Sequence, residues 1–229
     1  MYLESNNFKF PVQIIDEEWD DEVAIYVGQH RKTPCIIILI EKGKKVARMQ
    51  NVSFFDHCSV STENKFTRRS GAVVLMVKVV LQWLVHTYNI TTVVFADESH
   101  SEQGYMLPEK MMLTEGQTWY QKHLGAEPEA TRTKPIVKAF TKLYTQHKEH
   151  FKSLNCSAWL VDNLREVLKP YNNIIQHQQL TSSVWNITSK TIQNYNTVYT
   201  EHPETLGGSW KKQLQKRCMT PQLFKHIVE

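Results

Sequence analysis

A short basic turn, Arg68-Arg69-Ser70-Gly71-Ala72, stands directly before a long apolar run and has the residue types of a phosphate-binding site. If a helix begins here, its first backbone N–H groups have no partner within the helix and carry partial positive charge, which suits a diphosphate. Ser70, Gly71 and Ala72 are small enough to let such a group approach the backbone, and the two arginines add positive charge. An ordinary basic start of a helix has the same composition, so the turn leaves both interpretations open.

Tyr120 is the second candidate, in the segment Trp119-Tyr120-Gln121-Lys122-His123-Leu124-Gly125. A tyrosine hydroxyl is neutral at pH 7 and its proton can be aimed at a leaving group, so it can act as a general acid. Aromatic residues beside a glycine at a helix end are also common packing residues, and this alternative stays open. A general base would come from residues near the predicted strand ends, which stand at no diagnostic spacing: Asp56, His57, Asp97, Glu98 and His100.

Two further groups have suitable residue types but unsuitable spacing. Asp56, His57 and Cys58 are consecutive, and neighbours on a strand point to opposite faces, so we expect no catalytic relay among them. His147 and His150 are three residues apart on a predicted helix and could share a metal, but no third ligand is near them in the sequence. We therefore expect no metal site.

The clearest element that must position these residues is a helix predicted over residues 72–85. Only Lys78 and Gln82 interrupt its apolar residues, and together with His86 they are spaced four apart, which places them on one narrow polar stripe. The stretch has no turn signal and is longer than most strands, yet it is too short and too interrupted to span a membrane. We therefore expect a buried helix between two strands.

Apolar runs separated by turn residues predict a mostly antiparallel sheet around this helix. The expected strands cover residues 8–15, 23–27, 34–40 and 46–61 before the helix, residues 91–96 after it, and the fragment SSVWNI near residue 185. The expected helices cover residues 109–113, 118–124, 134–151 and 158–168. The predicted fold is α+β, with a mixed, mostly antiparallel sheet flanked by helices and a helical or irregular C-terminal extension.

The order of these segments resembles the GCN5-related N-acetyltransferase family over roughly residues 8–130. The shared order is a strand meander, a glycine-containing basic turn, a buried helix, a strand, and a helix that ends in an aromatic-Tyr-x-Lys-x-Leu-Gly string. The string from Trp119 to Ala126 is the sharpest match and is similar to the family's Tyr-Glu-Lys-x-Gly-Phe helix end. The longer string MLTEGQTWYQKHLGA also looks like acetyltransferase-like proteins of large DNA viruses.

The resemblance implies acetyl-coenzyme A as cofactor and Tyr120 as the general acid that protonates the departing thiolate. It places the coenzyme pyrophosphate on Arg68, Arg69, Ser70, Gly71 and Ala72. The turn departs from the family's Gln/Arg-x-x-Gly-x-Gly/Ala pattern, because aligning Arg68 and Gly71 with it puts Val73 at the last small position. Aligning Ala72 there instead puts Thr67 and Ser70 in the first and fourth positions, so either register breaks one requirement.

Charge is distributed unevenly along the chain of 229 residues. Residues 1–130 hold 13 Lys/Arg against 17 Asp/Glu, a net charge of −4, whereas residues 131–229 hold 14 against 6, a net charge of +8. This step predicts a boundary near residue 130, so the domain that the resemblance to the acetyltransferase family implies would cover residues 1–130 and a basic C-terminal extension would cover residues 131–229. The extension could bind nucleic acid, or its basic residues could form a solvated face without a partner. The residues that could contact nucleic acid follow Trp210 in the sequence and are Lys211, Lys212, Lys216 and Arg217.

Four scattered cysteines without a CxxC pair predict reduced thiols in an intracellular protein, in the host cytoplasm or in a virion if the chain is viral. The N-terminal residues show no signal-peptide pattern, and we expect neither secretion nor a membrane segment. Two functions follow. The chain is an acyl-coenzyme A-dependent N-acyltransferase, or it is a catalytically silent structural or regulatory subunit with a protein partner, plausibly in a viral particle. The imperfect turn, the missing base and the basic extension suit the second, and the sequence leaves both functions open.

Overall fold

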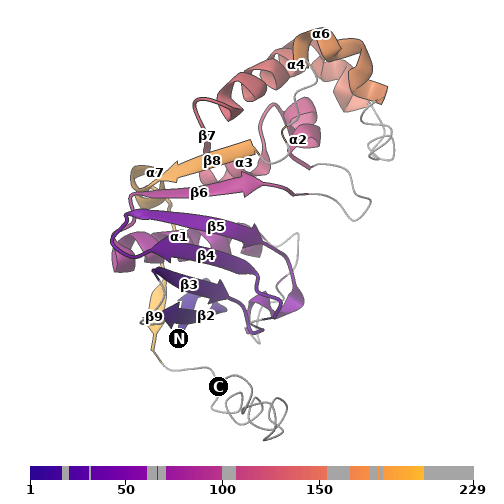
Figure 1. Ribbon diagram of the computed structural model, residues 1–229. Coiled ribbons are helices and arrows are strands. Elements are labelled where there is room, and N and C mark those ends of the chain that lie inside the picture. The colour runs from indigo at the N-terminus through magenta and orange to yellow at the C-terminus, as the bar shows by residue number, and fades with distance from the viewer. Residues whose placement is uncertain are drawn as a thin grey trace, which may run out of the picture.

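The computed structural model describes residues 1–16, 21–30, 32–60, 66, 71–99, 107–153, 166–175, 180 and 183–203. One sheet of nine strands runs through the described part in the order β7-β8-β6-β5-β4-β3-β2-β1-β9 (Figure 1). The neighbouring strands are antiparallel except for β5 and β6, so the predicted α+β class with a mostly antiparallel sheet is confirmed. The strands are β1 (Tyr2–Ser5), β2 (Phe8–Asp16), β3 (Glu22–Val27), β4 (Ile36–Glu41), β5 (Val46–Val52), β6 (Thr92–Asp97), β7 (Glu127–Pro128), β8 (Ser183–Thr188) and β9 (Thr200–His202).

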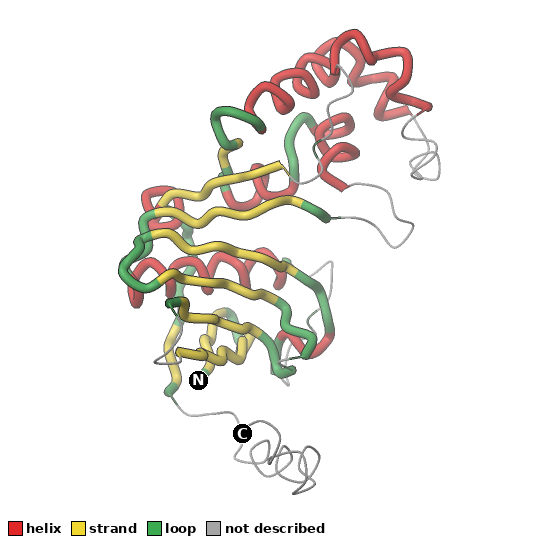
Figure 2. Tube along the Cα trace, viewed as in Figure 1, coloured by secondary structure: helices red, strands yellow, loops and turns green. Residues whose placement is uncertain are grey.

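The helices lie on one face of the sheet and beyond one of its edges. Helices α1 and α3 lie behind the sheet in Figure 1, and α2, α4 and α6 pack together beyond the β7–β8 edge. No helix of the described residues covers the opposite face, which is turned toward the viewer in Figure 2. The helices are α1 (Ala72–Tyr88), α2 (Leu107–Glu115), α3 (Trp119–Leu124), α4 (Thr133–Ser153), α6 (Asn172–Ile175) and α7 (Ser189–Gln193), with 3-10 turns η1 (Asp56–Cys58) and η3 (Lys169–Tyr171).

Most predicted elements are confirmed, and two differ in extent. The predicted helices over residues 109–113, 118–124 and 134–151 correspond to α2, α3 and α4, and most of the one predicted over residues 158–168 lies outside the described residues. The strand predicted over residues 46–61 ends at Val52, because the chain turns into η1. None of the helices that the structure describes is long and apolar enough to cross a membrane.

Helix α1 is buried as predicted, but its polar stripe faces protein. Ten of its 17 residues are buried, so packing holds it on nearly all sides. A strap, residues 194–199 between α7 and β9, covers the stripe. Gln82 donates from Nε2 to the carbonyl oxygen of Tyr195 at 2.9 Å, and His86 Nδ1 lies 3.0 Å from the hydroxyl of Tyr199. The Lys78 ammonium lies 5.1 Å from the centroid of the Tyr195 ring.

The sheet crosses the division predicted at residue 130. Strand β8 pairs with β6 along its full length, from Thr92↔Thr188 to Asp97↔Ser183, and β9 pairs with β1 at the other end of the sheet. Trp185 and Ile187 of β8 are fully buried in the same core as α1. Strands β8 and β9 therefore belong to the same sheet as the strands that precede residue 130, and the step in net charge does not coincide with a break in the core.

Strands β5 and β6 separate after a short parallel contact. They pair only at Val46↔Thr92, Ala47↔Val93 and Arg48↔Val94, although β5 continues to Val52 and β6 to Asp97. A bulge in β5 accompanies the separation: Ile38 of β4 pairs with Met49 while Ile37 pairs with Asn51, which leaves Gln50 as the extra residue. Because a bulge bends its strand and increases its twist, it turns the end of β5 away from β6.

Two cysteines form a disulfide, contrary to the prediction of reduced thiols. Cys35 and Cys58 are joined at an S–S distance of 2.02 Å, with Cα atoms 5.7 Å apart. The antiparallel pairing of β4 with β5 brings the start of β4 beside the segment after β5, so two cysteines 23 residues apart become neighbours. The disulfide removes the cysteine argument for a reducing compartment. Asp56-His57-Cys58 lies in η1 rather than on a strand, and the disulfide takes the thiol of Cys58 out of any relay.

Candidate functional site

A cleft opens where β5 and β6 separate. It has a cavity volume of about 1210 Å³ and is walled by residues of both strands, including Met49, Gln50, Val94 and Ala96. The remaining walls are the segment Ser53–Phe55 after β5, the segment Asp97–Ser99 after β6, and the beginnings of α1, α2 and α3. The sheet therefore contributes a gap between two strands, and helices bound that gap on the covered face.

The beginning of α1 borders the cleft through Gly71, Val73 and Val74. Gly71 precedes the helix with a left-handed backbone (φ 71°), and a Cβ added there would meet no atom within 4 Å, so the space beside it is open. The first turn of α1 contains no acidic side chain. Of the five residues predicted to bind a pyrophosphate, Gly71 lies at the cleft, and Ala72 is buried in the core instead. Arg68, Arg69 and Ser70 lie outside the described residues.

Tyr120 reaches the cleft from α3. This helix is well defined at both ends, because Thr118 and Gln121 form a capping box and Gly125 ends it in a left-handed conformation. The Tyr120 ring packs against Phe95 of β6 with centroids 4.4 Å apart, so the residue does contribute to packing. It also lines the cleft, and its hydroxyl forms no hydrogen bond within the described part of the chain.

The pKa of Tyr120 is raised far above its ordinary value, first by burial and second by the carboxyl group of Asp97. A raised pKa keeps a phenol protonated throughout the physiological range. Tyr120 is therefore a hydrogen-bond donor at the cleft, as a general acid must be before the reaction.

Asp97 is the acidic group that the fold brings to the cleft. It ends β6, lines the cleft and is only 1% exposed. Ser99 donates to its Oδ1 twice, from the backbone N–H at 3.2 Å and from the hydroxyl at 2.6 Å. Burial raises the pKa of Asp97, and the two hydrogen bonds from Ser99 lower it by less.

The other candidate bases fall into three groups. Glu98 lines the cleft next to Asp97 but is exposed. His57 is outside the cleft, where its Nε2 lies 2.8 Å from the carbonyl oxygen of Thr33. His100 lies outside the described residues, as does the side chain of Asp56. Sequence reasoning could not rank these candidates, because their ranking depends on which strand ends face the gap.

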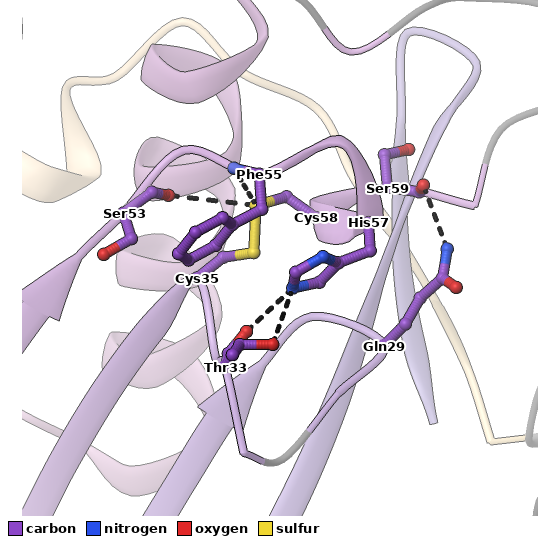
Figure 3. Close-up of a disulfide and its surroundings, with 8 residues drawn as sticks. All are labelled: Gln29, Thr33, Cys35, Ser53, Phe55, His57, Cys58 and Ser59. Carbon is purple, nitrogen blue, oxygen red and sulfur yellow. Dashed lines mark hydrogen bonds between the residues drawn. A yellow bond between two sulfur atoms is a disulfide. The ribbon is translucent and has the colours of Figure 1, made fainter.

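One wall of the cleft, Ser53–Phe55, lies beside the disulfide, and Figure 3 shows Ser53 and Phe55 next to the bonded Cys35 and Cys58. Ser53 donates from its backbone N–H to the carbonyl oxygen of Cys35 at 2.7 Å, and Cys58 donates to the carbonyl oxygen of Phe55 at 3.0 Å. The Phe55 ring stacks on His57 with centroids 5.0 Å apart. Residues Ser53–Phe55 are therefore fixed between the start of β4 and η1. The sequence carries no signal for this wall beyond the presence of two cysteines.

The predicted absence of a shared metal at His147 and His150 stays a prediction. The ring of His147 lies 4.8 Å from that of Tyr171, and the backbone of α4 is non-helical at this histidine. Within the described residues, no three His, Cys, Asp or Glu side chains are grouped as metal ligands would be.

Comparison with known proteins adds no relative: a scan of protein-family models, a search of curated proteins and a search of solved structures found no match to this chain.

Proposed function

We propose that the chain is an N-acyltransferase of the GCN5-related type that transfers an acetyl group from acetyl-coenzyme A to an amine. The observation that carries the proposal is the cleft between the separating parallel strands, with the start of α1 at one side and Tyr120 at the other. Such a cleft offers a place for each part of an acyl-coenzyme A: an anionic diphosphate, an extended amide-containing arm and a thioester.

The diphosphate belongs at the first turn of α1. This helix has 17 residues, begins with open space beside Gly71 and has no acidic side chain in its first turn, so the partial positive charge of its N–H groups is not offset there. The cleft reaches the same turn through Gly71 and Val73.

The extended arm belongs along β5. After Arg48 no strand of the described residues pairs with the edge of β5 that faces β6, although the strand continues to Val52. An unpaired strand edge presents backbone N–H and C=O groups to an extended ligand with amides of its own, as in peptide binding by strand addition. A backbone N–H of this edge would also stabilise the oxyanion of a tetrahedral intermediate.

The chemical step then needs a neutral amine and a proton for sulfur. The amine nitrogen attacks the thioester carbonyl carbon, the C–S bond breaks, and the sulfur takes the proton of Tyr120. Tyr120 suits this role because its hydroxyl is protonated and not engaged by another described side chain.

A catalytically silent subunit on the same fold is the second candidate function, and one observation favours it. In one of the two alignments with the family pattern Val73 takes the position of a small residue, and Val73 lines the cleft at the first turn of α1. In this candidate the protein acts through a protein partner, plausibly in a viral particle, and the basic residues after Pro203 contact that partner or nucleic acid. Intracellular localisation belongs to both proposals.

Measuring the binding of acetyl-coenzyme A to the purified chain distinguishes the acyltransferase from the catalytically silent subunit. We expect calorimetry to detect binding, and a ligand at about 100 times its Kd should stabilise the protein by about 2.7 kcal/mol. Purified protein that shows neither heat nor thermal stabilisation at millimolar acetyl-coenzyme A would contradict the acyltransferase and leave the silent subunit.

Substitution of Gly71 tests where the diphosphate binds. Gly71→Glu places bulk and negative charge at the first turn of α1, and we expect acetyl-coenzyme A binding to weaken on the order of tenfold or more, about 1.4 kcal/mol. Gly43→Glu is the matched control, because Gly43 also has a positive φ (79°) and open space around it but does not line the cleft. Equal binding by both variants would place the diphosphate elsewhere.

A further inference from the structure

Asp97 and Tyr120 line the cleft together, and the acyl-transfer mechanism described above gives a role to Tyr120 but none to Asp97. They come from different elements, the end of β6 and the first turn of α3, and both are buried side chains that line the same cavity. A carboxyl group in such a position has lost most of its water and retains access to whatever enters the cleft. An inert aspartate at a strand end would ordinarily be exposed.

Only one of the two carboxylate oxygens of Asp97 accepts hydrogen bonds from described residues. Both donors, the backbone N–H and the hydroxyl of Ser99, reach Oδ1, and Oδ2 accepts from no described residue. Ser183 stands directly opposite Asp97 in the β6–β8 pairing, and its Oγ is buried, at 6% residue exposure, with no partner in the described part. Ser183 does not itself line the cleft, but unsatisfied buried polar atoms are uncommon in proteins, so its Oγ marks the end of β6 as a place for a polar group.

We propose that Asp97 is the general base of the acyl transfer and that it works as a coupled pair with Tyr120. The inference depends on the proposed acyltransferase function. It identifies the acceptor as a primary amine whose nitrogen approaches Oδ2 from the cleft.

Each proton has a defined destination in this scheme. The neutral amine attacks the thioester carbon, and the excess proton on its nitrogen passes to Oδ2 of Asp97. The C–S bond then breaks, and the sulfur takes the proton of Tyr120. The proton held by Asp97 finally returns to the phenolate oxygen of Tyr120, directly or through a water molecule. The net transfer is one proton from the amine to the thiol, and both side chains regain their starting states.

The electrostatic interaction between Asp97 and Tyr120 favours this order of proton transfers. The negative charge of Asp97 is one of the two causes that raise the pKa of Tyr120. Once Asp97 has accepted a proton, that charge is neutralised and the pKa of Tyr120 falls. Tyr120 thus becomes a stronger acid at the stage when the thiolate leaves.

Few other charges act on the pair. The remaining ionisable side chains that line the cleft within the described residues are Arg48 on β5 and Glu98 beside Asp97. Arg48 is bound to Glu22, which partly neutralises it, and Glu98 is exposed and therefore screened by solvent.

The test is a double-mutant cycle on purified full-length protein, with spermidine and a lysine-containing peptide as amines and release of free thiol as the readout. Asp97→Asn is isosteric and can still accept the hydrogen bonds from Ser99, so the local turn is retained. Asp16→Asn is the matched control, because Asp16 also ends a strand, β2, but does not line the cleft. Acetyl-coenzyme A binding is measured separately for each variant, so that loss of binding is distinguished from loss of chemistry.

We expect Asp97→Asn to bind acetyl-coenzyme A as the wild type does and to lower kcat by about 10²- to 10⁴-fold, whereas Asp16→Asn stays within a few fold. In the wild type, kcat/KM should fall as the pH drops through the pKa of Asp97, because protonated Asp97 cannot accept a proton. This acidic limb should lie above the usual aspartate range and be absent in Asp97→Asn. The Asp97→Asn/Tyr120→Phe double variant should be little slower than the slower single variant.

Three results would overturn the role of Asp97: an Asp97→Asn variant with wild-type turnover, an unchanged acidic limb in that variant, or effects of the two substitutions that simply multiply. Wild-type protein that does not bind acetyl-coenzyme A at all would instead overturn the proposed acyltransferase. The two failures are therefore distinguishable.

Discussion

At the scale of single residues, Tyr120 shows that packing and catalysis are not exclusive alternatives. Its ring lies against Phe95 and Trp119, which is the packing role that its neighbours in the sequence suggest. Its hydroxyl is left without a hydrogen bond to any described residue while the side chain lines the cleft. The ring and the hydroxyl can therefore be tested separately.

Tyr120→Phe removes the hydroxyl and keeps the ring. Because no hydrogen bond is lost, we expect the free energy of unfolding in urea to change by less than about 1 kcal/mol. Acetyl-coenzyme A binding should also persist, and turnover should fall by about 10²- to 10⁴-fold. A Tyr120→Phe variant that turns over like the wild type would show that the hydroxyl has no catalytic role.

At the scale of elements, α1 was the easiest to predict from the sequence, since its apolar residues and its polar stripe follow helical spacing over several turns. What covers the stripe could not be predicted, because Tyr195 and Tyr199 are more than a hundred residues away from Gln82 and His86. The cleft was equally hidden. It depends on a bulge at Gln50 and on the point where β5 and β6 stop pairing, and neither has a pattern that a reader of one sequence can recognise.

Two substitutions on α1 test its orientation. Val80 is fully buried, so Val80→Asp should abolish soluble expression, because an unpaired buried charge costs several kcal/mol. Lys78 lies on the polar stripe, and Lys78→Glu removes only a contact with the Tyr195 ring, for which about 0.5–1 kcal/mol is typical at exposed sites. Soluble yield and thermal unfolding measure both effects. Similar behaviour of the two variants would mean that the helix is rotated relative to the described structure.

At the scale of the whole molecule, the sheet depends on residues from both ends of the described chain. Strand β8 shields one side of β6, and β9 shields β1 at the opposite edge. A protein that ends at residue 130 would lose both strands and the buried side chains of Trp185 and Ile187. The predicted division at that residue therefore makes a direct experimental test.

Truncation provides the test. We expect residues 1–130 to be insoluble or unfolded, because two strand edges and part of the core would be exposed. Residues 1–203 keep every strand of the described sheet and should retain the circular dichroism spectrum and cooperative unfolding of the full chain. A folded 1–130 fragment would show that the first half is a self-sufficient domain despite the shared sheet.

The strap and β9 have a consequence for synthesis of the protein. Tyr2 stacks on His202 with ring centroids 4.3 Å apart, so β1 finds its outer neighbour only after nearly all of the described chain has been made. At about 5–20 residues per second, translation leaves that edge without its partner for roughly 10 to 40 s. During this interval the nascent chain exposes an open strand edge to other chains.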